Sequence, residues 1–497
     1  MESADRPLQA TRDPRERGLK HREIGFWGAA AMSIAAMGPL LGALGVAPLI
    51  VSEAGFSAPF IFIVCWVAMF AVALTIGRFS RLLPGAASLY SYITHGLGEK
   101  LGFLSAWWSF SYYILFIPLL LVAIGLYAQA AGNDVFSFNV EWWVWAIAAA
   151  AIVAALAIIG IRISMRIDLT LAVICDGFLL LISLIIIGKV IGDGDFTLAP
   201  LSPSHAPSQF TGLSLAIAFG VLIFLGFEQS FVLGEEVSDP HGNVPKAIYA
   251  SLALVGTVLF LATFALVLGF GQSGIGRLNN LFASQGTPWF ALVKERIGTG
   301  WVDVLEVLIV FSILSNTIAS TNSVVRIQYG MGRARALPRQ LGWTLPRRQT
   351  PYVSIIVNIA LGLAITLVPG LVWSPTSLFS FLGFLIGFAA AVTFILIALA
   401  ALRYFQLARA GAGIFGRWIV PIVAIIILVP VVYTSFYPNP GYPLNWAPRL
   451  VLIWLGVGII YLIWRVARRQ RVDLDYAFRE AGEPVPPEAL ATEPKVE

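Results

Sequence analysis

Two carboxylic acids lie in apolar segments of the sequence, where a charged side chain is unfavourable and therefore indicates a specific role. Asp176 stands within "LAVICDGFLLLISL", and Glu228 follows Gly226 within "FLGFEQSFVLG". A charge at the centre of a bilayer costs at least about 2.5–3.5 kcal/mol, and such side chains face the interior of a helix bundle. We interpret Asp176 as a proton-coupling group or as the counter-ion of a cationic ligand, with a hydrogen-bonded structural acid as the alternative. Glu228 either holds the chain near Gly226 in shape or serves as a second proton site.

The backbone offers a second kind of chemistry at Gly38-Pro39. This pair falls in the middle of the apolar segment "GFWGAAAMSIAAMGPLLGALGVAPLIV". Proline has no N–H to donate, and its ring clashes with the carbonyl one turn back. Irregular backbone at membrane depth is tolerated only where it lines a water-filled cavity or is buried in protein. We therefore expect an interrupted helix whose free N–H and C=O groups suit a carboxylate and an ammonium, with a simple proline kink as the alternative.

The composition identifies the elements that position these groups. Hydrophobic residues make up 58% of the chain and charged residues 12%, whereas a soluble protein carries about a quarter charged residues. The sequence therefore predicts an all-α integral membrane protein that contacts the lipid bilayer. A span needs about 20 mostly apolar residues. Twelve such spans are predicted, at about 26–51, 58–80, 101–131, 142–162, 166–191, 211–236, 246–271, 302–330, 352–371, 376–401, 418–437 and 449–467.

The order of the spans suggests a repeat. The sixth span begins five spans after the first and carries Gly226 near its middle, so both contain an interruption. Matched interruptions favour a five-plus-five inverted repeat with discontinuous helices 1 and 6. The predicted divisions are a tail at 1–24, a first repeat at 25–210, a second repeat at 211–402, two accessory helices at 403–467 and a second tail at 468–497.

Basic residues gather in alternate connecting segments, which predicts that both termini are cytoplasmic. The polar first 24 residues lack the apolar core of a signal peptide, and we expect a cytoplasmic tail there. A multi-pass protein of the plasma membrane, the inner membrane of a bacterial cell, is the expected location.

Several classes of function find no support in the sequence. No G-x-x-x-x-G-K-[ST] pattern occurs, and no nucleophile–base set stands at depth, so we expect no enzyme and no cofactor. The net charge of +5 follows from the membrane topology and does not indicate nucleic acid. Cys65 and Cys175 lie in apolar runs and are predicted to be small core residues rather than metal ligands. Ser320 and Thr321 are weak candidates for Na⁺ ligands, although such residues are equally common as contacts between helices.

Three stretches resemble the amino acid–polyamine–organocation transporter superfamily. They are "SRLLPGAASLYSYITHGLGEKLGFLSAWW", "FLGFEQSFVLGEEVSDPHGNVPKAI" and "NSVVRIQYGMGRARALPRQLGWTLPRRQTP". The resemblance implies a transporter of amino acids, polyamines or related amines that works by proton symport or by exchange. It also implies that the substrate's backbone groups bind the unwound parts of helices 1 and 6. By motif match these positions are Met37, Gly38, Pro39, Leu40, Leu222, Ile223, Phe224, Leu225 and Gly226.

One position departs from the family pattern. Family members often have G-S-G or G-T-G in helix 1, whereas this chain has Gly38-Pro39-Leu40. Proline removes one N–H from the carboxylate cradle, which shifts the expectation towards substrates without a free α-carboxylate, such as amines. Phe227 is a candidate gate by its position, and Tyr90 matches a family tyrosine on the inner approach.

The sequence thus predicts a proton-coupled secondary active transporter, an amino acid permease that works by alternating access. An amino acid or amine exchanger and a polyamine importer remain alternatives. A channel is less favoured because no repeated pore loop is visible.

Overall fold

The computed structural model describes residues 24–83, 89–159, 161–232, 237–333, 337–345, 350–407, 413–437 and 441–467. Within these ranges the chain forms helices and turns, with one isolated bridge between Ile24 and Val237 and no strand. The predicted tails at 1–24 and 468–497 fall outside the described residues, apart from Ile24. For the described residues, the structure confirms the all-helical class that the composition predicts.

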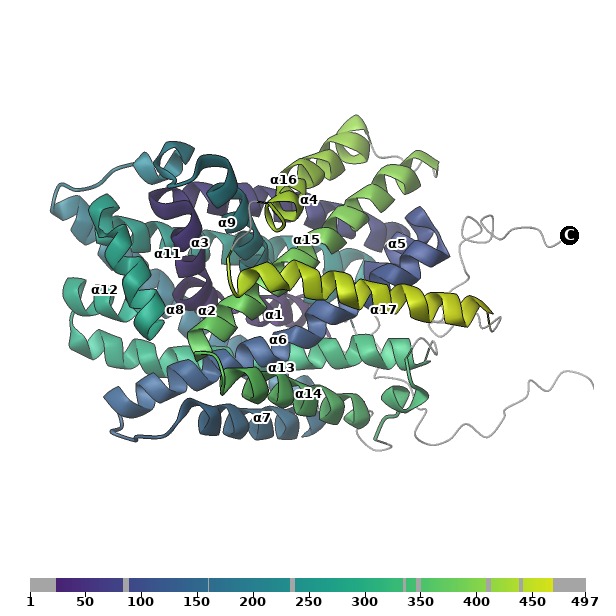
Figure 1. Cartoon of the computed structure of the whole chain (residues 1–497), viewed down its shortest axis with the longest axis horizontal. Helices are drawn as coiled ribbons and strands as arrows, with labels where there is room; N and C mark the ends of the chain where they lie inside the picture. Colours follow the sequence, from purple (N-terminus) through teal and green to yellow (C-terminus); the bar gives the residue numbers. More distant parts are fainter. Residues whose placement is uncertain are drawn as a thin grey trace, which may run out of the picture.

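Most of the helices run along one common direction as a bundle (Figure 1). The α-helices are α1 Phe26–Met37, α2 Pro39–Leu41, α3 Ala47–Ala54, α4 Ala58–Leu82, α5 Leu89–Leu97, α6 Glu99–Asp134, α7 Trp142–Ile159, α8 Ile161–Gly192, α9 Gln209–Phe224, α10 Gln229–Val232, α11 Pro240–Gln285, α12 Pro288–Arg296, α13 Thr299–Arg333, α14 Tyr352–Gly370, α15 Pro375–Leu407, α16 Val420–Thr434 and α17 Ala447–Ala467. Two π-helical turns, η2 Gly42–Val46 and η7 Phe415–Ile419, adjoin α3 and α16.

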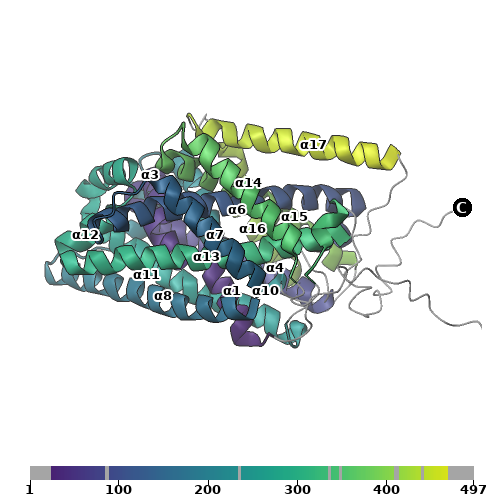
Figure 2. The same cartoon turned by 90° about the horizontal axis from the view of Figure 1, so that it is seen from below.

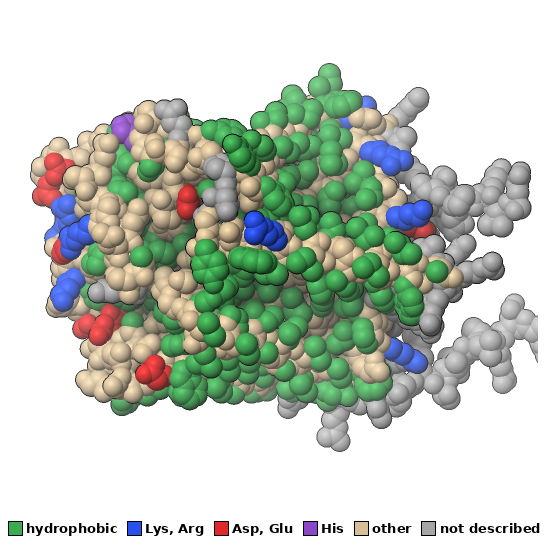
Figure 3. Space-filling view, in the orientation of Figure 1, with side chains coloured by type: hydrophobic (Ala, Val, Ile, Leu, Met, Phe, Trp, Pro, Cys, Tyr) green, Lys and Arg blue, Asp and Glu red, His purple; other side chains and the backbone are tan. Residues whose placement is uncertain are grey.

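Ten helical stretches in the described part of the chain are long and apolar enough to cross a membrane. The first, Phe26–Leu82, covers two of the predicted spans, and the shorter apolar helix Phe210–Phe224 covers the first half of the predicted span 211–236. The visible surface carries a broad hydrophobic band with Lys and Arg side chains at both of its ends, whereas Asp and Glu side chains are seen mostly at the end that contains α12 (Figures 1 and 3). The chain is therefore a multi-pass membrane protein.

A pair of tryptophans attaches α17, which lies at the edge of the bundle (Figure 2). The Nε1 of Trp107 in α6 donates to the Trp454 carbonyl at 2.9 Å, and the Nε1 of Trp454 donates to the Trp107 carbonyl at 3.2 Å. Their rings stack with centroids 4.6 Å apart. Each indole therefore buries its apolar face and satisfies its one donor in a region where water is absent.

The segment between the predicted spans 246–271 and 302–330 is largely helical, and the predicted end at residue 271 coincides with a kink in α11. Gly271 has non-helical dihedral angles (φ 69°, ψ 168°), but α11 continues beyond it to Gln285. Leu278 and Phe282, spaced by four residues, are buried on one face of this extension. Polar residues end the apolar run after Gly271, which is why hydropathy alone did not predict this second helical segment.

The helix α12 lies at one end of the bundle (Figures 1 and 2) and is fixed by ion pairs. Glu295 pairs with Arg277 of α11, and this hydrogen-bonded guanidinium lowers the pKa of the Glu295 carboxyl. Arg296 pairs with Asp193 after α8 at 2.8 Å. These exposed pairs orient α12 more than they stabilise the fold.

Trp289 of α12 completes the hydrogen bonding of the π-helical turn η2. The π-helical pattern of η2 joins an N–H to the carbonyl five residues earlier, as Ala47 N does to Gly42 O. The matching donor for the Ala43 carbonyl would come from residue 48, which is Pro48 and has no N–H. The buried Nε1 of Trp289 donates to the Ala43 carbonyl instead, at 2.9 Å.

Replacing Trp289 with phenylalanine is expected to destabilise the protein, because the Ala43 carbonyl would be left buried and unpaired. The cost of such a group is about 1–3 kcal/mol, and the midpoint of thermal unfolding in detergent measures it. Trp143→Phe, at a tryptophan that is 39% exposed, is the matched control and should leave the midpoint unchanged. Equal midpoints for wild type and Trp289→Phe would show that the hydrogen bond contributes nothing.

Candidate functional site

The first interruption lies between α1 and α2 at Gly38. This residue adopts the left-handed conformation (φ 56°, ψ 64°), and its N–H donates to the Ile34 carbonyl at 3.2 Å. A new helical segment then begins with Pro39, whose fixed φ suits a first helical position. A Cβ at Gly38 would overlap the side-chain amide of Asn316 in α13. Glycine is therefore required here both for the conformation and for the contact.

The second interruption lies between α9 and α10. The helix ends at Phe224, Leu225 is extended (φ −60°, ψ 136°), and Gly226 has a φ of 113° that side chains rarely adopt. A Cβ on Gly226 would lie 2.6 Å from the carbonyl carbon of Ala36 and 2.7 Å from the nitrogen of Met37. The two interruptions therefore meet backbone to backbone, although nearly 190 residues separate them in the sequence.

Ser33 of α1 ties the two interruptions together. Its Oγ donates to the Phe227 carbonyl at 2.9 Å and accepts from the Ser230 N–H at 3.0 Å. It also lies 3.0 Å from the Ser230 Oγ. One buried hydroxyl of α1 thus satisfies a backbone carbonyl within the second interruption and a backbone N–H of α10.

Glu228 folds back on the irregular turn that precedes it. Its side chain is fully buried, and its Oε2 accepts from the Gly226 N–H at 3.1 Å. Its Oε1 accepts from the hydroxyl of Tyr113 in α6 at 3.2 Å. These contacts favour the interpretation that Glu228 holds the turn in shape, while its role as a second proton site stays a prediction.

Backbone groups without partners surround the point where the interruptions meet. The last carbonyls of a helix have no intrahelical donor. No hydrogen bond from the described part of the chain reaches the carbonyls of Ala35, Ala36 or Met37 at the end of α1. Those of Val221 and Ile223 near the end of α9 likewise have none.

The complementary donors begin the next helical segment. Pro39 has no N–H, and the N–H groups of Leu40 and Leu41 have no acceptor among the described residues. Three helix termini therefore meet at this point. The C-terminal ends of α1 and α9 present free carbonyls at the negative ends of their dipoles, and the N-terminal end of α2 presents free N–H groups. The arrangement offers more acceptors for an ammonium group than donors for a carboxylate.

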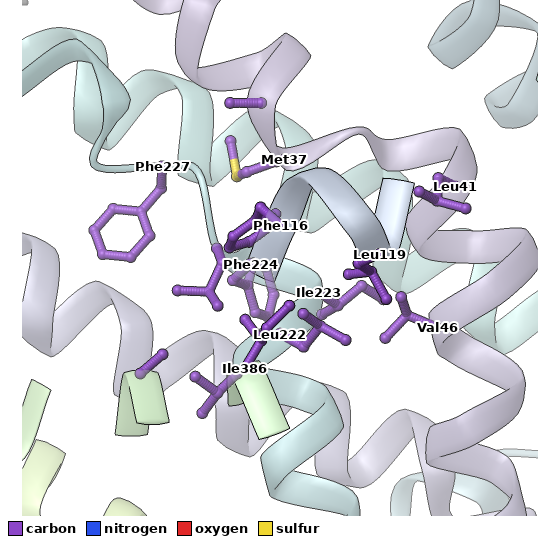
Figure 4. Close-up of a cluster of buried hydrophobic side chains, with 14 of the residues drawn as sticks. Met37, Leu41, Val46, Phe116, Leu119, Leu222, Ile223, Phe224, Phe227 and Ile386 are labelled. Atoms are coloured by element: carbon purple, nitrogen blue, oxygen red, sulfur yellow. The ribbon is translucent and has the colours of Figure 1, made fainter. Parts of the chain in front are cut away.

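Apolar side chains line the same region (Figure 4). Met37, Phe116 and Phe224 lie close together between the interrupted helices, with Leu222, Ile223 and Ile386 beside them. All nine positions predicted to bind substrate are buried: Met37, Gly38, Pro39, Leu40, Leu222, Ile223, Phe224, Leu225 and Gly226. Their placement around one contact point is a fact of the structure, while their role in binding stays a prediction.

The other predicted residues lie at different depths around this point. Phe227 is fully buried, and its ring centroid is 5.8 Å from that of Phe394 in α15. Tyr90 is buried in α5, where its carbonyl accepts from the Thr94 hydroxyl at 2.9 Å. Asp176 is half-buried in α8, a helix that packs against α1 and α2, but no hydrogen bond joins it to the interruptions. Its Oδ1 is inaccessible to solvent and has no partner among the described residues.

The weak sodium candidates lie on α13, the helix whose Asn316 touches Gly38. Ser320 donates to the Asn316 Oδ1 at 3.1 Å, so this hydroxyl is engaged within its own helix. The Thr321 Oγ1 is buried and finds no partner in the described part of the chain. No group of three or more His, Cys, Asp or Glu side chains that could hold a metal occurs among the described residues. Cys65 and Cys175 are both buried and free, as predicted.

Sequence reasoning missed Ser33 and did not foresee what Asn316 and Tyr113 contact. The available signal for Ser33 was a lone hydroxyl five residues before Gly38 in an otherwise apolar run. The partners of Asn316 and Tyr113 depend on how α13 and α6 pack, which a local pattern does not contain.

Comparison with known proteins places this geometry among permeases. The model of the amino acid permease family matches residues 24–462. The chain is 26% identical over 306 residues to the low-affinity putrescine importer PlaP of Escherichia coli K12, a match that covers 60% of this chain and 64% of the importer. The match thus spans less than two thirds of that importer's length.

Two other relatives are matched over more of their length. The L-asparagine permease of Escherichia coli K12 is 24% identical over 435 residues, which cover 81% of this chain and 82% of that permease. A methylthioribose transporter of Bacillus subtilis is 26% identical over 425 residues, which cover 81% of this chain and 84% of that transporter.

Replacing Gly226 with alanine is expected to abolish correct assembly of the two interruptions, because the new Cβ would collide with the Ala36 backbone. The fraction of monodisperse protein after detergent extraction, measured by size-exclusion chromatography, should fall at least severalfold. Gly188→Ala, in α8 with no atom near the new Cβ, is the control and should behave like wild type. Normal yield and stability of Gly226→Ala would contradict the close contact.

Proposed function

The chain belongs to the amino acid permease family, and we propose that it is a secondary active transporter that carries an amino acid or related amine across the plasma membrane, coupled to protons. Members of this family are transporters rather than enzymes. The observation that carries the proposal is the meeting of two interrupted helices, with unpartnered backbone groups at membrane depth. Leaving such groups unpaired in a protein interior is costly, and a polar ligand that pairs them accounts for their presence.

The substrate's ammonium group would bind the free carbonyls of Ala36, Met37 and Ile223. A carboxylate, where the substrate has one, would bind the N–H groups of Leu40 and Leu41. Because Pro39 removes the first donor of this series, the amine end of the substrate is held more fully than the acid end. A putrescine importer and an L-asparagine permease among the relatives fit this range of amines and amino acids.

Apolar contacts would select substrates by the shape of their carbon skeleton. Met37, Phe116 and Phe224 would face the carbon skeleton, and no charged side chain other than Glu228 lies among the buried residues next to the interruptions in the described part of the chain. We therefore expect amines and amino acids with apolar or uncharged side chains to be preferred over dicarboxylic acids.

The proposal includes the predicted topology and its motion. Residues 25–210 and 211–402 would form two inverted repeats, with 403–467 as accessory helices and both termini in the cytoplasm. Alternating access would then expose the interruptions to each side in turn. Phe227 and Tyr90 would close the inner approach.

Asp176 would carry the coupling proton. The unpartnered position of its Oδ1 supports this role, since no hydrogen bond within the described protein holds the carboxyl in one protonation state. A proton from the outer solution would bind the carboxylate and give a neutral acid. After the conformational change, the acid would release the same proton to the cytoplasm, and the carboxylate would be restored.

Uptake into proteoliposomes of a labelled panel of amino acids, putrescine and other polyamines tests the proposed function. Saturable uptake of one class, faster with an inward proton gradient, is the expected result. Uptake that requires unlabelled substrate inside the vesicles would indicate exchange rather than symport. Currents far above carrier turnover rates would contradict the transporter mechanism in favour of a channel.

Replacing Asp176 with asparagine is expected to remove the response to the proton gradient while leaving substrate binding intact. A gradient of one pH unit is worth about 1.4 kcal/mol per proton, or about tenfold in accumulation at equilibrium. The ratio of uptake with and without the gradient measures the effect, and it should fall to about one. Asp195→Asn, at an exposed residue after α8, is the control, and full gradient response in Asp176→Asn would refute the assignment.

A further inference from the structure

Two guanidinium groups lie partly buried away from the substrate site, at the junction of α4 and η7. The Nη1 of Arg78 and the Nε of Arg417 are inaccessible to solvent, and neither finds a hydrogen-bond partner in the part of the chain that the structure describes. The Arg78 guanidinium lies directly against the backbone of Gly416, where a Cβ would overlap it. Because Gly416 directly precedes Arg417 in the chain, the Arg417 backbone lies next to the Arg78 guanidinium.

The charge at this junction is uncompensated among the described residues. Arg81, one turn after Arg78 on α4, is exposed, and both arginines lie near enough to the Tyr249 hydroxyl to act on it electrostatically. The described ion pairs, Arg277–Glu295 and Arg296–Asp193, involve other residues. Partly buried cations without an acceptor are unfavourable, so an anion at this junction would be stabilised by at least two guanidinium groups.

The surroundings of the two cations are those of a membrane surface. Next to Gly416 and Arg417, large hydrophobic side chains point outward without cover from the described chain: Ile414, Phe415, Trp418, Ile419 and Ile422, with exposed fractions of 77%, 61%, 43%, 46% and 38%. At the end of the hydrophobic band opposite α12, most of the charged side chains in view are Lys and Arg (Figures 1 and 3). Tryptophan beside arginine is typical of the interface between lipid headgroups and acyl chains.

We propose that this junction is a binding site for an anionic phospholipid, whose phosphate pairs with Arg78 and Arg417 and whose acyl chains lie along Phe415, Trp418 and Ile422. The planar guanidinium fork matches the oxygens of a phosphate. The adjoining apolar side chains favour a lipid over free phosphate, because acyl chains can pack against them and a soluble anion cannot. Bound lipid would join α4 to α16, and both of these helices pack against α9.

Native mass spectrometry of the full-length protein in detergent tests the site with phosphatidylglycerol and phosphatidylcholine as probes. The expected result is that wild type retains phosphatidylglycerol at concentrations at least tenfold lower than phosphatidylcholine. Arg417→Gln and Arg78→Gln should each weaken phosphatidylglycerol binding severalfold, and the double variant should abolish the preference. Lys100→Gln, which removes an exposed positive charge at the start of α6, is the control and should bind like wild type.

The comparison of the two lipids on the wild-type protein tests the site even if the variants fail to fold. Equal retention of the two lipids would overturn it. Stabilisation against heat by millimolar inorganic phosphate that equals the effect of phosphatidylglycerol would also overturn it, since the site would then take a soluble anion. Unchanged lipid preference in a folded double variant would place the lipid elsewhere.

Discussion

Every backbone polar group within a bilayer must find a partner inside the protein, and this constraint governs the structure of the whole chain. Helices meet it along most of their length. Where the helices break, single side chains meet it instead. Ser33 serves the Phe227 carbonyl, Glu228 serves the Gly226 N–H, and Trp289 serves the Ala43 carbonyl.

What these side chains leave unpaired defines the candidate site. The free carbonyls at the ends of α1 and α9 and the free N–H groups after Pro39 remain in one place because glycine allows the two backbones to touch. The same ties join α1 to α10. Ser33 bonds to Phe227 within the second interruption and to Ser230 of α10, and the Ser238 N–H donates to the Ile24 carbonyl at 2.8 Å. Any movement of α1 that keeps these bonds carries α10 with it.

Local signals in the sequence sufficed for the helical class and for the position of both interruptions. Gly38-Pro39 is a signal because proline removes a donor, and Gly226 is one because an acid, Glu228, stands two residues after it in an apolar run. The extension of α11 beyond Gly271 and the helix α12 escaped prediction, since their faces are buried by tertiary packing rather than by lipid. Ser33, Asn316 and Tyr113 acquire their roles from contacts across more than 100 residues, and no single-sequence pattern contains such contacts.

For Asp176 and Glu228, too, the sequence predicted part of the result and the structure supplies the rest. The apolar context of Asp176 and Glu228 marked both as unusual, but the two environments differ. Glu228 accepts two hydrogen bonds at the turn, whereas the Oδ1 of Asp176 accepts none from the described protein. The hydrogen bonds of Glu228 support a structural role, and the unpartnered oxygen of Asp176 supports our proposal that this residue carries the proton.

Electron cryo-microscopy of the protein in lipid nanodiscs, with the substrate that uptake assays identify, would show whether the two interrupted helices hold the substrate. We expect density for the substrate's amine within hydrogen-bonding distance of the Ala36, Met37 or Ile223 carbonyls, beside Phe224. Substrate density elsewhere in the bundle, with the carbonyls at both interruptions still unpaired, would contradict it.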